Sequence, residues 1–231
     1  MADTGKPVKT RPTRRKPGRP KASDMIGLED PRTRLEEVGI RVFAQYGYDA
    51  VSTGDIARAA GLTQPMVHYH FGSKEALWKA AMTRLMRSLG TRFPTNTPEL
   101  KDLGPIDRLK VMIRRFILVS GYEPKLSQII LHESLSRSDR LDWLIEQYVR
   151  RGFGEFDDVF QAGIDAGLIK DLPLYAITNS IVNAASCTFC FAALVDKVYD
   201  VDVLASERVQ EIADTLIEIV FHGVVRQGAG N

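Results

Sequence analysis

The chain has 231 residues, of which 44% are hydrophobic and 26% are charged, the ordinary composition of a globular protein with one or two compact domains. Two cysteines are too few for a disulfide framework, and the N-terminus has no apolar segment of the kind that signal peptides carry. The composition therefore argues against a disulfide-stapled secreted protein, and we expect a cytoplasmic one.

The formal net charge of +2 conceals an uneven distribution. Residues 1–23 carry a net charge of +7, residues 24–90 are balanced, and residues 91–231 carry −5. Positive charge gathered at one end of the chain and acidity at the other indicates that an anionic polymer is bound at the N-terminal side.

Residues 1–24 combine Lys, Arg, Pro and Gly with almost no large apolar side chain, so we expect this arm to be disordered when alone. Within it, Arg19 lies in a Gly-Arg-Pro core flanked by basic residues, which resembles part of an AT-hook that inserts Arg into the minor groove of DNA. Pro17 stands where a complete hook carries a second arginine. The alternative is a solubilising basic tail that attracts phosphates without specificity.

The first helix is predicted to begin at Pro31, where proline suits the first turn, and to end at Gly47. Apolar residues recur along it mostly at three- and four-residue spacing, which predicts a core-facing stripe. The stripe consists of Leu35, Val38, Val42, Phe43 and Tyr46.

The stretch Ser52–Leu77 predicts two short helices joined by a tight turn and followed by the start of a third. Thr53 is predicted to cap the first helix, whose core-facing residues are Ile56, Ala57 and Ala60. Gly61 ends that helix because the turn needs a left-handed backbone. This arrangement is the geometry of a helix-turn-helix, so the stretch predicts DNA binding.

The second helix of this stretch is expected to present polar and aromatic side chains to DNA. Thr63 can cap it, and Pro65 fits its first turn. Val67 and Phe71 point to the core, which leaves the outward face to Gln64, Met66, His68 and Tyr69. Ser73 is predicted to cap the next helix, where the N-terminal amides and Lys74 suit a DNA phosphate.

Several of these elements together resemble the DNA-binding domain of the TetR family. The resemblance covers about Arg32 to Met82, and its motifs are Tyr46-Gly47-Tyr48, Ile56-Ala57, Ala60-Gly61-Leu62 and Tyr69-His70-Phe71-Gly72-Ser73-Lys74-Glu75-Ala76-Leu77. It implies that Gln64 to His70 form the recognition helix that reads the major groove. Carried over by position, phosphates would be held by Thr53, Thr63, His68 and Lys74, and bases would be faced by Gln64, Pro65, Met66 and Tyr69.

Two residues depart from the family pattern. His68 stands where tyrosine is usual, and Gly54 stands where some members place a base-reading arginine. The operator sequence of another member therefore does not transfer to this chain.

Beyond residue 90 the resemblance is architectural. We expect an all-α protein with three parts: the basic arm (1–24), the helix-turn-helix domain (25–89), and a helical effector-binding and dimerisation domain (90–231). Residues 90–104 are rich in Pro, Gly, Thr and Asn and are predicted to connect the last two. Later helices are predicted from Pro124 to Arg137 and from an Asp139 cap to Gly167.

The last two predicted helices are the expected dimer interface. Residues 172–195 contain no charge, but their Thr, Asn and Ser side chains make them too polar for a membrane span, so a buried or interface helix is expected. The final helix carries a clean apolar stripe from Val209 to Val224. In a TetR-like chain two such helices imply a four-helix homodimer interface, which places two recognition helices on successive major grooves.

The family resemblance also implies a small-molecule effector. Apolar lining and orienting polar groups are expected from Phe116, Trp143, Phe153, Phe156 and Phe160 with Asn179, Asn183 or Glu133. The alternative for each aromatic residue is ordinary core packing. Glu133 falls on the stripe with Ile129 and Ile130, so it is expected to point inward.

No enzymatic chemistry is indicated. Cys187 and Cys190 form a C-x-x-C inside an apolar helix without further ligands, which favours two packed thiols over a redox or zinc site. The four histidines have no metal-ligand spacing, and no catalytic or phosphate-loop motif is present in the sequence. We expect no cofactor and no metal.

Together these features predict a cytoplasmic, nucleoid-associated repressor that binds a near-palindromic operator as a homodimer and is released by a small molecule. The competing hypothesis is a DNA-architectural protein without an effector. An enzyme with an appended DNA-binding domain is a third.

Overall fold

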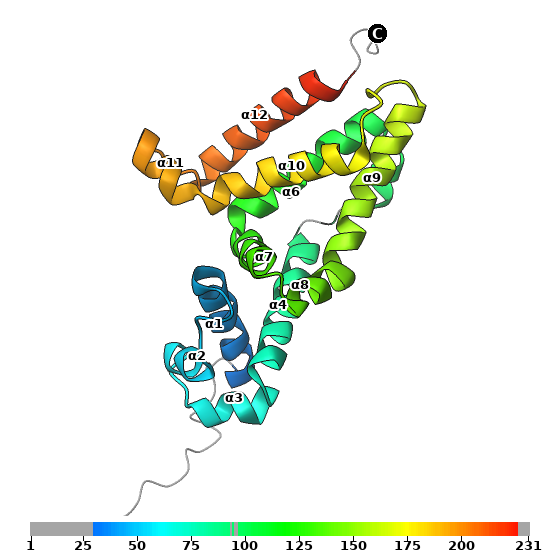
Figure 1. Ribbon diagram of the computed structural model, residues 1–231. Helices are drawn as coiled ribbons and strands as arrows, with labels where there is room; N and C mark the ends of the chain where they lie inside the picture. Colours follow the sequence, from blue (N-terminus) through cyan, green and yellow to red (C-terminus); the bar gives the residue numbers. More distant parts are fainter. Residues whose placement is uncertain (1–29, 93, 95–96, 226–231) are drawn as a thin grey trace, which may run out of the picture. The chain divides into compact units, whose positions relative to one another are not determined.

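The computed structural model describes residues 30–92, 94 and 97–225, and the basic arm with Arg19 lies outside these residues. Within the described part every regular element is helical, apart from an isolated bridge between Ile169 and Val225. The all-α prediction is therefore confirmed. The helices are α1 (Pro31–Tyr46), α2 (Thr53–Ala59), α3 (Gln64–Phe71), α4 (Lys74–Arg92), α5 (Pro98–Lys101), α6 (Pro105–Tyr122), α7 (Lys125–Ser136), α8 (Asp139–Leu144), α9 (Arg150–Asp165), α10 (Leu174–Cys190), α11 (Ala192–Tyr199) and α12 (Ser206–Val224) (Figure 1).

A first hydrophobic cluster joins α1 to α4. Leu35, Val38 and Phe43 of the α1 stripe are buried in this cluster, as the periodicity predicted, and α1 packs against α4. Tyr46, however, is largely exposed, because the stripe turns away from the core in the last turn of α1. Ile129 of α7 and Leu144 of α8 also belong to this cluster, so helices far along the chain help to bury the N-terminal ones.

A second hydrophobic cluster surrounds α6, which packs against α9, α10 and α12. Its fully buried members include Leu109, Ile113, Phe160 and Val209. Two glycines allow close packing: Gly121 lets α6 approach α12, and Gly163 of α9 leaves room for Ile169 in the segment that follows that helix. A Cβ on Gly121 would lie 2.6 Å from a methyl carbon of Val209, and one on Gly163 would lie 2.5 Å from the Ile169 side chain.

Two predicted helix caps are wrong by one residue, for the same reason. Ser52, not Thr53, caps α2, and Ser138, not Asp139, caps α8. In both helices the serine hydroxyl accepts a hydrogen bond from a backbone N–H three residues later, and an acidic residue then lies in the first turn, where it favours the helix dipole.

Three segments are more broken than the sequence pattern indicated. The connection over residues 90–104 contains the short helix α5, whose Leu100 is buried. The helix expected from 139 to 167 contains a π-helical turn, Ile145–Val149, between α8 and α9. The apolar stretch 172–195 is divided at Phe191, where α10 and α11 meet at a bend of 66°.

No single helix of the described residues is long and apolar enough to cross a membrane, although α10 and α11 taken together have the length and composition of a broken span.

Candidate nucleic-acid interface

The turn between α2 and α3 forms as the sequence predicted. Ser52 caps α2 in a capping box, because Asp55 Oδ2 accepts a hydrogen bond from the Ser52 backbone N–H at 3.1 Å while Ser52 Oγ accepts one from the Asp55 N–H. The Ser52 hydroxyl also donates to Asp55 Oδ2, and this hydrogen bond is the main cause that lowers the pKa of the Asp55 carboxyl, followed by those from the Ser52 backbone N–H and from Arg58. Gly61 then turns the chain with a φ of +64°, and Pro65 occupies the first turn of α3. The two helices are therefore held in a fixed mutual orientation.

The outward face of α3 offers hydrogen-bonding and aromatic side chains. Val67 is buried and anchors the helix, while Tyr69 is 85% exposed. Gln64, Pro65 and His68 are exposed as well. A short helix that presents such a face and is supported by a second helix has the form of a helix that reads a DNA groove.

Two predicted base- or groove-facing residues are less accessible than expected. Met66 and His70 are half-buried, and the His70 ring packs against Tyr69 with the centroids 5.0 Å apart. The helix is short, so its flanks partly contact neighbouring helices and only a narrow strip is fully outward.

A hydrogen bond ties the first residues of the two helices together. Gln64 Nε2 donates to Thr53 Oγ1 at 3.2 Å, which links a residue expected to face bases with one expected to hold a phosphate. Thr63 occupies the N-cap position of α3, as predicted, but its side chain makes no cap hydrogen bond. Both threonine hydroxyls therefore lie at helix N-termini, where an anion is favoured.

Lys74 begins α4, and Ser73 caps that helix by accepting a hydrogen bond from the Ala76 N–H at 3.0 Å. The Lys74 ammonium lies 4.0 Å from the centre of the Tyr48 ring, and its side chain is half-buried. Burial is the main cause that lowers the pKa of Lys74. The cation is thus held at the edge of the helix-turn-helix, beside α4's first amides.

The aromatic residues expected to surround an effector pack in two different hydrophobic clusters. Trp143 packs against the first hydrophobic cluster, with its ring 5.7 Å from that of Trp78. Phe116 and Phe156 pack edge to face in the second cluster, and Phe153 is half-buried on α9. The aromatic residues are therefore divided between two cores.

The polar members of that set are also separated. Asn183 donates a hydrogen bond to Asn179 at 2.9 Å on the exposed face of α10. Glu133 is only 1% exposed, so it points inward as expected, but it is paired with Arg140 and Ser138.

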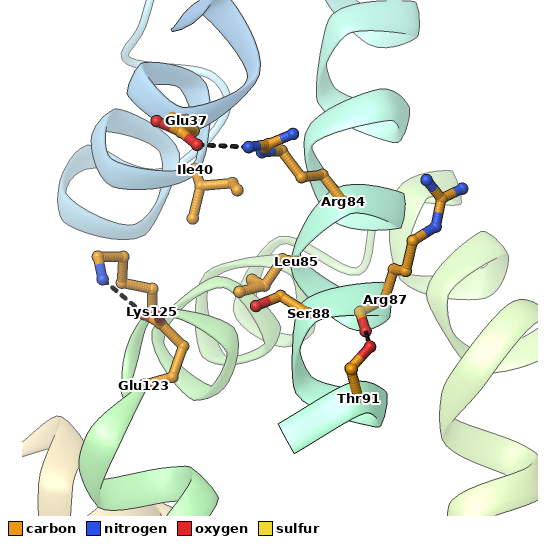
Figure 2. Close-up of a pocket in the computed structure, with 9 residues that line it drawn as sticks. All are labelled: Glu37, Ile40, Arg84, Leu85, Arg87, Ser88, Thr91, Glu123 and Lys125. Carbon is orange, nitrogen blue, oxygen red and sulfur yellow. Dashed lines mark hydrogen bonds and ion pairs between the residues drawn. The ribbon is translucent and has the colours of Figure 1, made fainter. Parts of the chain in front are cut away.

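The structure contains open clefts that the sequence did not reveal. One, of about 470 Å³, lies between α1, α4 and the α6–α7 turn, and Figure 2 shows Glu37 and Arg84 facing each other across it, with Ile40, Leu85 and Lys125 nearby. Arg87, Ser88 and Thr91 of α4 line it as well. A second cleft, of about 320 Å³, is lined by Gln45, His132 and Cys190 among others. Both clefts are formed by residues from helices that are distant in the sequence, so no local motif predicts either cleft.

Cys187 and Cys190 are free and half-buried near the C-terminal end of α10. Burial, with a smaller contribution from Cys187, raises the pKa of Cys190 to about 11, so its thiolate is disfavoured. Within the described part of the chain, no group of three or more His, Cys, Asp or Glu side chains is placed to hold a metal ion.

Comparisons with solved structures support the fold. The regulator KstR2 of Mycobacterium tuberculosis superposes with a TM-score of 0.67 at 20% identity, over 87% of this chain and 97% of that one. AibR, solved with isovaleryl coenzyme A and operator DNA, gives 0.68 at 20% identity, over 83% and 98%. A regulator from Saccharomonospora viridis, solved with choline, gives 0.62 at 18% identity, over 85% and 98%.

Sequence comparisons point to the same group of proteins. The regulator BetI of Rhizobium meliloti is 28% identical over 129 residues, and BetI of Brucella suis (strain ATCC 23445 / NCTC 10510) is 39% identical over 129 residues. Each match covers 54% of this chain and just under two thirds of the relative, 63% and 64% respectively. Residues 37–81, which span the helix-turn-helix, match the family model described as bacterial regulatory proteins, tetR family. The helix-turn-helix domain of this chain therefore belongs to the TetR family, and the all-helical fold and the relatives agree with that assignment.

Proposed function

We propose that this protein is a transcription repressor that binds a near-palindromic operator as a homodimer and is released by a small molecule. The observation that carries the proposal is the outward face of α3, with exposed Gln64 and Tyr69 held in place by buried Val67. The net charge of +7 over residues 1–23 adds attraction to the phosphate backbone beside this domain.

The α3 face is tested by selecting DNA from a random pool with the whole chain. A two-fold symmetric consensus is the expected result. Tyr69→Ala should weaken binding to the selected duplex about tenfold, because one base-edge contact is removed. Ala59→Ser, a polar change at an exposed position of α2, is the control and should bind normally. Normal binding by Tyr69→Ala at fixed salt would contradict the roles assigned to α3.

The homodimer is supported by exposed apolar residues on the last three helices. Tyr175 of α10 is 80% exposed and Ile219 of α12 is 62% exposed, and α11 exposes Leu194 and Val198. Apolar surface of this kind is usually covered by a partner. Ile219→Asp should yield monomers in analytical ultracentrifugation. Ser180→Asp tests the polar face of α10, and a monomeric Ser180→Asp variant would show that this face also belongs to the dimer contact. A wild-type monomer at micromolar concentration would refute the dimer.

Effector release is supported by the family and by the ligands of two structural neighbours. Choline and isovaleryl coenzyme A, bound in those neighbours, are suitable first probes. A ligand that binds only the native protein raises its melting temperature, and it should also displace the selected duplex.

The division of the expected pocket residues between two cores favours the second candidate, a DNA-architectural protein without an effector. This candidate predicts DNA binding that no compound in a broad thermal-shift screen alters. It also predicts bending of the duplex, measured by fluorescence transfer between its ends, whereas a repressor requires only occupancy of the operator.

A further inference from the structure

Tyr48, in the loop between α1 and α2, carries two cations on its ring. The Lys74 ammonium lies 4.0 Å from the ring centre, and the Arg140 guanidinium carbon lies 3.6 Å from it. Lys74 starts α4 beside the helix-turn-helix, whereas Arg140 belongs to α8, more than sixty residues later. Through a single aromatic ring, the expected phosphate ligand is therefore connected to the C-terminal part of the chain.

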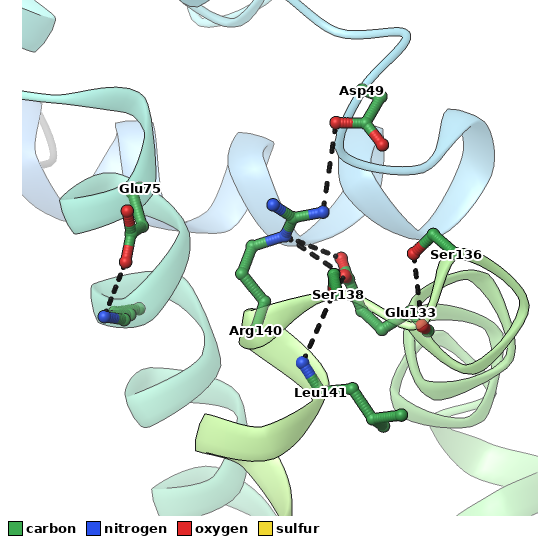
Figure 3. A network of polar contacts seen from close by, with 8 residues as sticks. Asp49, Glu75, Glu133, Ser136, Ser138, Arg140 and Leu141 are labelled. Carbon is green, nitrogen blue, oxygen red and sulfur yellow. Dashed lines mark hydrogen bonds and ion pairs between the residues drawn. The ribbon is translucent and has the colours of Figure 1, made fainter.

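Arg140 is fixed in place by its own partners. Its Nε donates to both carboxylate oxygens of Glu133, at 3.2 and 3.1 Å, and the Ser138 hydroxyl donates to the same carboxylate (Figure 3). Glu133 is almost completely buried, so its charge requires these partners. On the other side, an Arg140 terminal nitrogen lies 3.9 Å from Asp49 (Figure 3). The guanidinium thus has a defined orientation before any DNA arrives.

Lys74, in contrast, has no ion-pair partner among the carboxylates of the described residues. Burial lowers its pKa, Asp49 opposes that effect, and the charge of Arg140 lowers the pKa further. Glu133 balances the charge of Arg140, and the carboxylate that acts on Lys74 is Asp49, whose side chain is 79% exposed. The Lys74 ammonium is therefore available to an external anion. Besides Asp49 and Arg140, the nearby charged group on α4 is Glu75, which pairs with Lys79.

The geometry points to Arg140 as a positioning residue for DNA binding, and we propose that it orients Lys74 toward a DNA phosphate by holding the Tyr48 ring. This inference rests on the proposed DNA binding. The ring is stacked on Phe43 with centroids 5.8 Å apart and is contacted by Arg140, and in this position it holds the Lys74 ammonium 4.0 Å from its centre. Without Arg140 the lysine samples more rotamers, and binding a phosphate then costs more conformational entropy.

The test uses the full chain and a labelled mixed-sequence duplex of about 30 base pairs, because phosphate contacts need no particular sequence. Arg140→Gln alone would leave Glu133 buried and unpaired, so the variant is Glu133→Gln with Arg140→Gln. This double variant should weaken binding about fivefold, the equivalent of one cation–π contact. In a Lys74→Gln background the same double variant should change affinity less than about twofold, because the group that it positions is gone.

The salt dependence separates positioning from direct contact. Lys74→Gln should reduce the slope of log affinity against log salt by about one, while the Glu133→Gln/Arg140→Gln variant should leave the slope unchanged. A reduced slope in the latter would show that Arg140 itself contacts a phosphate, which overturns the positioning role. The matched control is Glu146→Gln with Arg150→Gln, an exposed pair in the following turns, which should bind as the wild type does.

Tyr48→Leu provides a second route, because it removes the ring and keeps the Glu133–Arg140 pair. It should show the same dependence on Lys74. Equal losses of affinity with and without Lys74, for both variants, would refute the inference while leaving DNA binding intact. A wild-type chain that binds no duplex at low salt would instead refute the proposed function, and this inference with it.

Discussion

The two hydrophobic clusters of this protein differ in how directly their sequences determine them. In the first, short helices with caps, a glycine turn and a proline at a helix start set the positions of almost every side chain between Pro31 and Leu77. In the second, long helices apolar on several sides surround α6, and the pattern does not distinguish a residue that fills a core from one that lines a cavity. Short helices bounded by caps, glycine and proline therefore allow the role of single residues to be predicted from sequence. Long helices that are apolar on several sides allow only the architecture to be predicted.

The largest expected effect comes from opening a cavity in each cluster. Phe43→Ala and Phe160→Ala remove fully packed rings, one from each core, and each should cost about 3–5 kcal/mol. Both tryptophans, Trp78 and Trp143, belong to or pack against the first cluster, so fluorescence follows that cluster while circular dichroism follows all helices. Because Ile129 and Leu144 join the first cluster from later helices, we expect both signals to shift together in urea.

A Phe160→Ala variant that shifted only the circular dichroism transition would contradict this expectation. The two clusters would then unfold independently, and the helix-turn-helix could be studied as an isolated domain. Leu135→Ala, which truncates an exposed side chain of α7, is the control and should leave both transitions nearly unchanged.

A smaller effect is expected from overpacking the second cluster. Gly121→Ala places a methyl group against Val209 and Phe189, which should cost about 1–3 kcal/mol despite the better helix propensity of alanine. Gly152→Ala is the matched control, because it is also helical but meets no atom within 4 Å. It should stabilise the protein by up to about 1 kcal/mol. Melting curves of the two variants that moved in the same direction would contradict the close packing of α6 on α12.

The smallest expected change in stability comes from removing the N-cap of α2. Ser52→Ala should destabilise the protein by about 1 kcal/mol, whereas Thr53→Ala should have little effect on stability. The cap also has a pH signature. Hydrogen bonds from Ser52 lower the pKa of Asp55, so this stabilisation is present above the ordinary carboxyl pKa of about 3.9 and disappears as the pH falls through the lower folded value.

Urea titrations of wild type and Ser52→Ala at several pH values check this. The difference in unfolding free energy should be largest near neutral pH and should shrink in acid. A difference that stayed constant down to strongly acidic pH would mean that Asp55 does not take part in the capping box.

The sequence predicted the helix-turn-helix in detail because its signals are local. Gly61, Pro65 and Ser73 each have one conformational role, and the structure places each where the pattern indicated. The cap errors arose because Ser-Thr and Ser-Asp pairs offer two adjacent capping oxygens, and only three-dimensional geometry selects one. Met66 was expected to face outward, and it is half-buried because helical periodicity does not show where a flank meets a neighbouring helix.

The expected effector residues were less predictable because their environment depends on long-range packing. Nothing local to Trp143 indicates that it joins Trp78, and nothing local to Glu133 indicates its pairing with Arg140. The charged cleft beside Glu37 and Arg84 is likewise assembled from three separate segments. Such sites come from tertiary contacts, which an apolar stripe does not encode.

The π-helical turn at Ile145–Val149 determines which mutations this segment can accept. It adds one residue to a turn, which rotates everything after it by about 100° relative to a regular helix. The sequence reflects the extra residue: in the apolar stripe of this segment, Tyr148 and Phe153 are five residues apart, where the spacing is otherwise mostly three or four. One continuous rod can thereby face the first cluster with Trp143 and Tyr148 and the second with Phe156 and Phe160. Loss of a single residue within the turn would put the two halves of that rod out of phase, so this segment tolerates substitution far better than deletion.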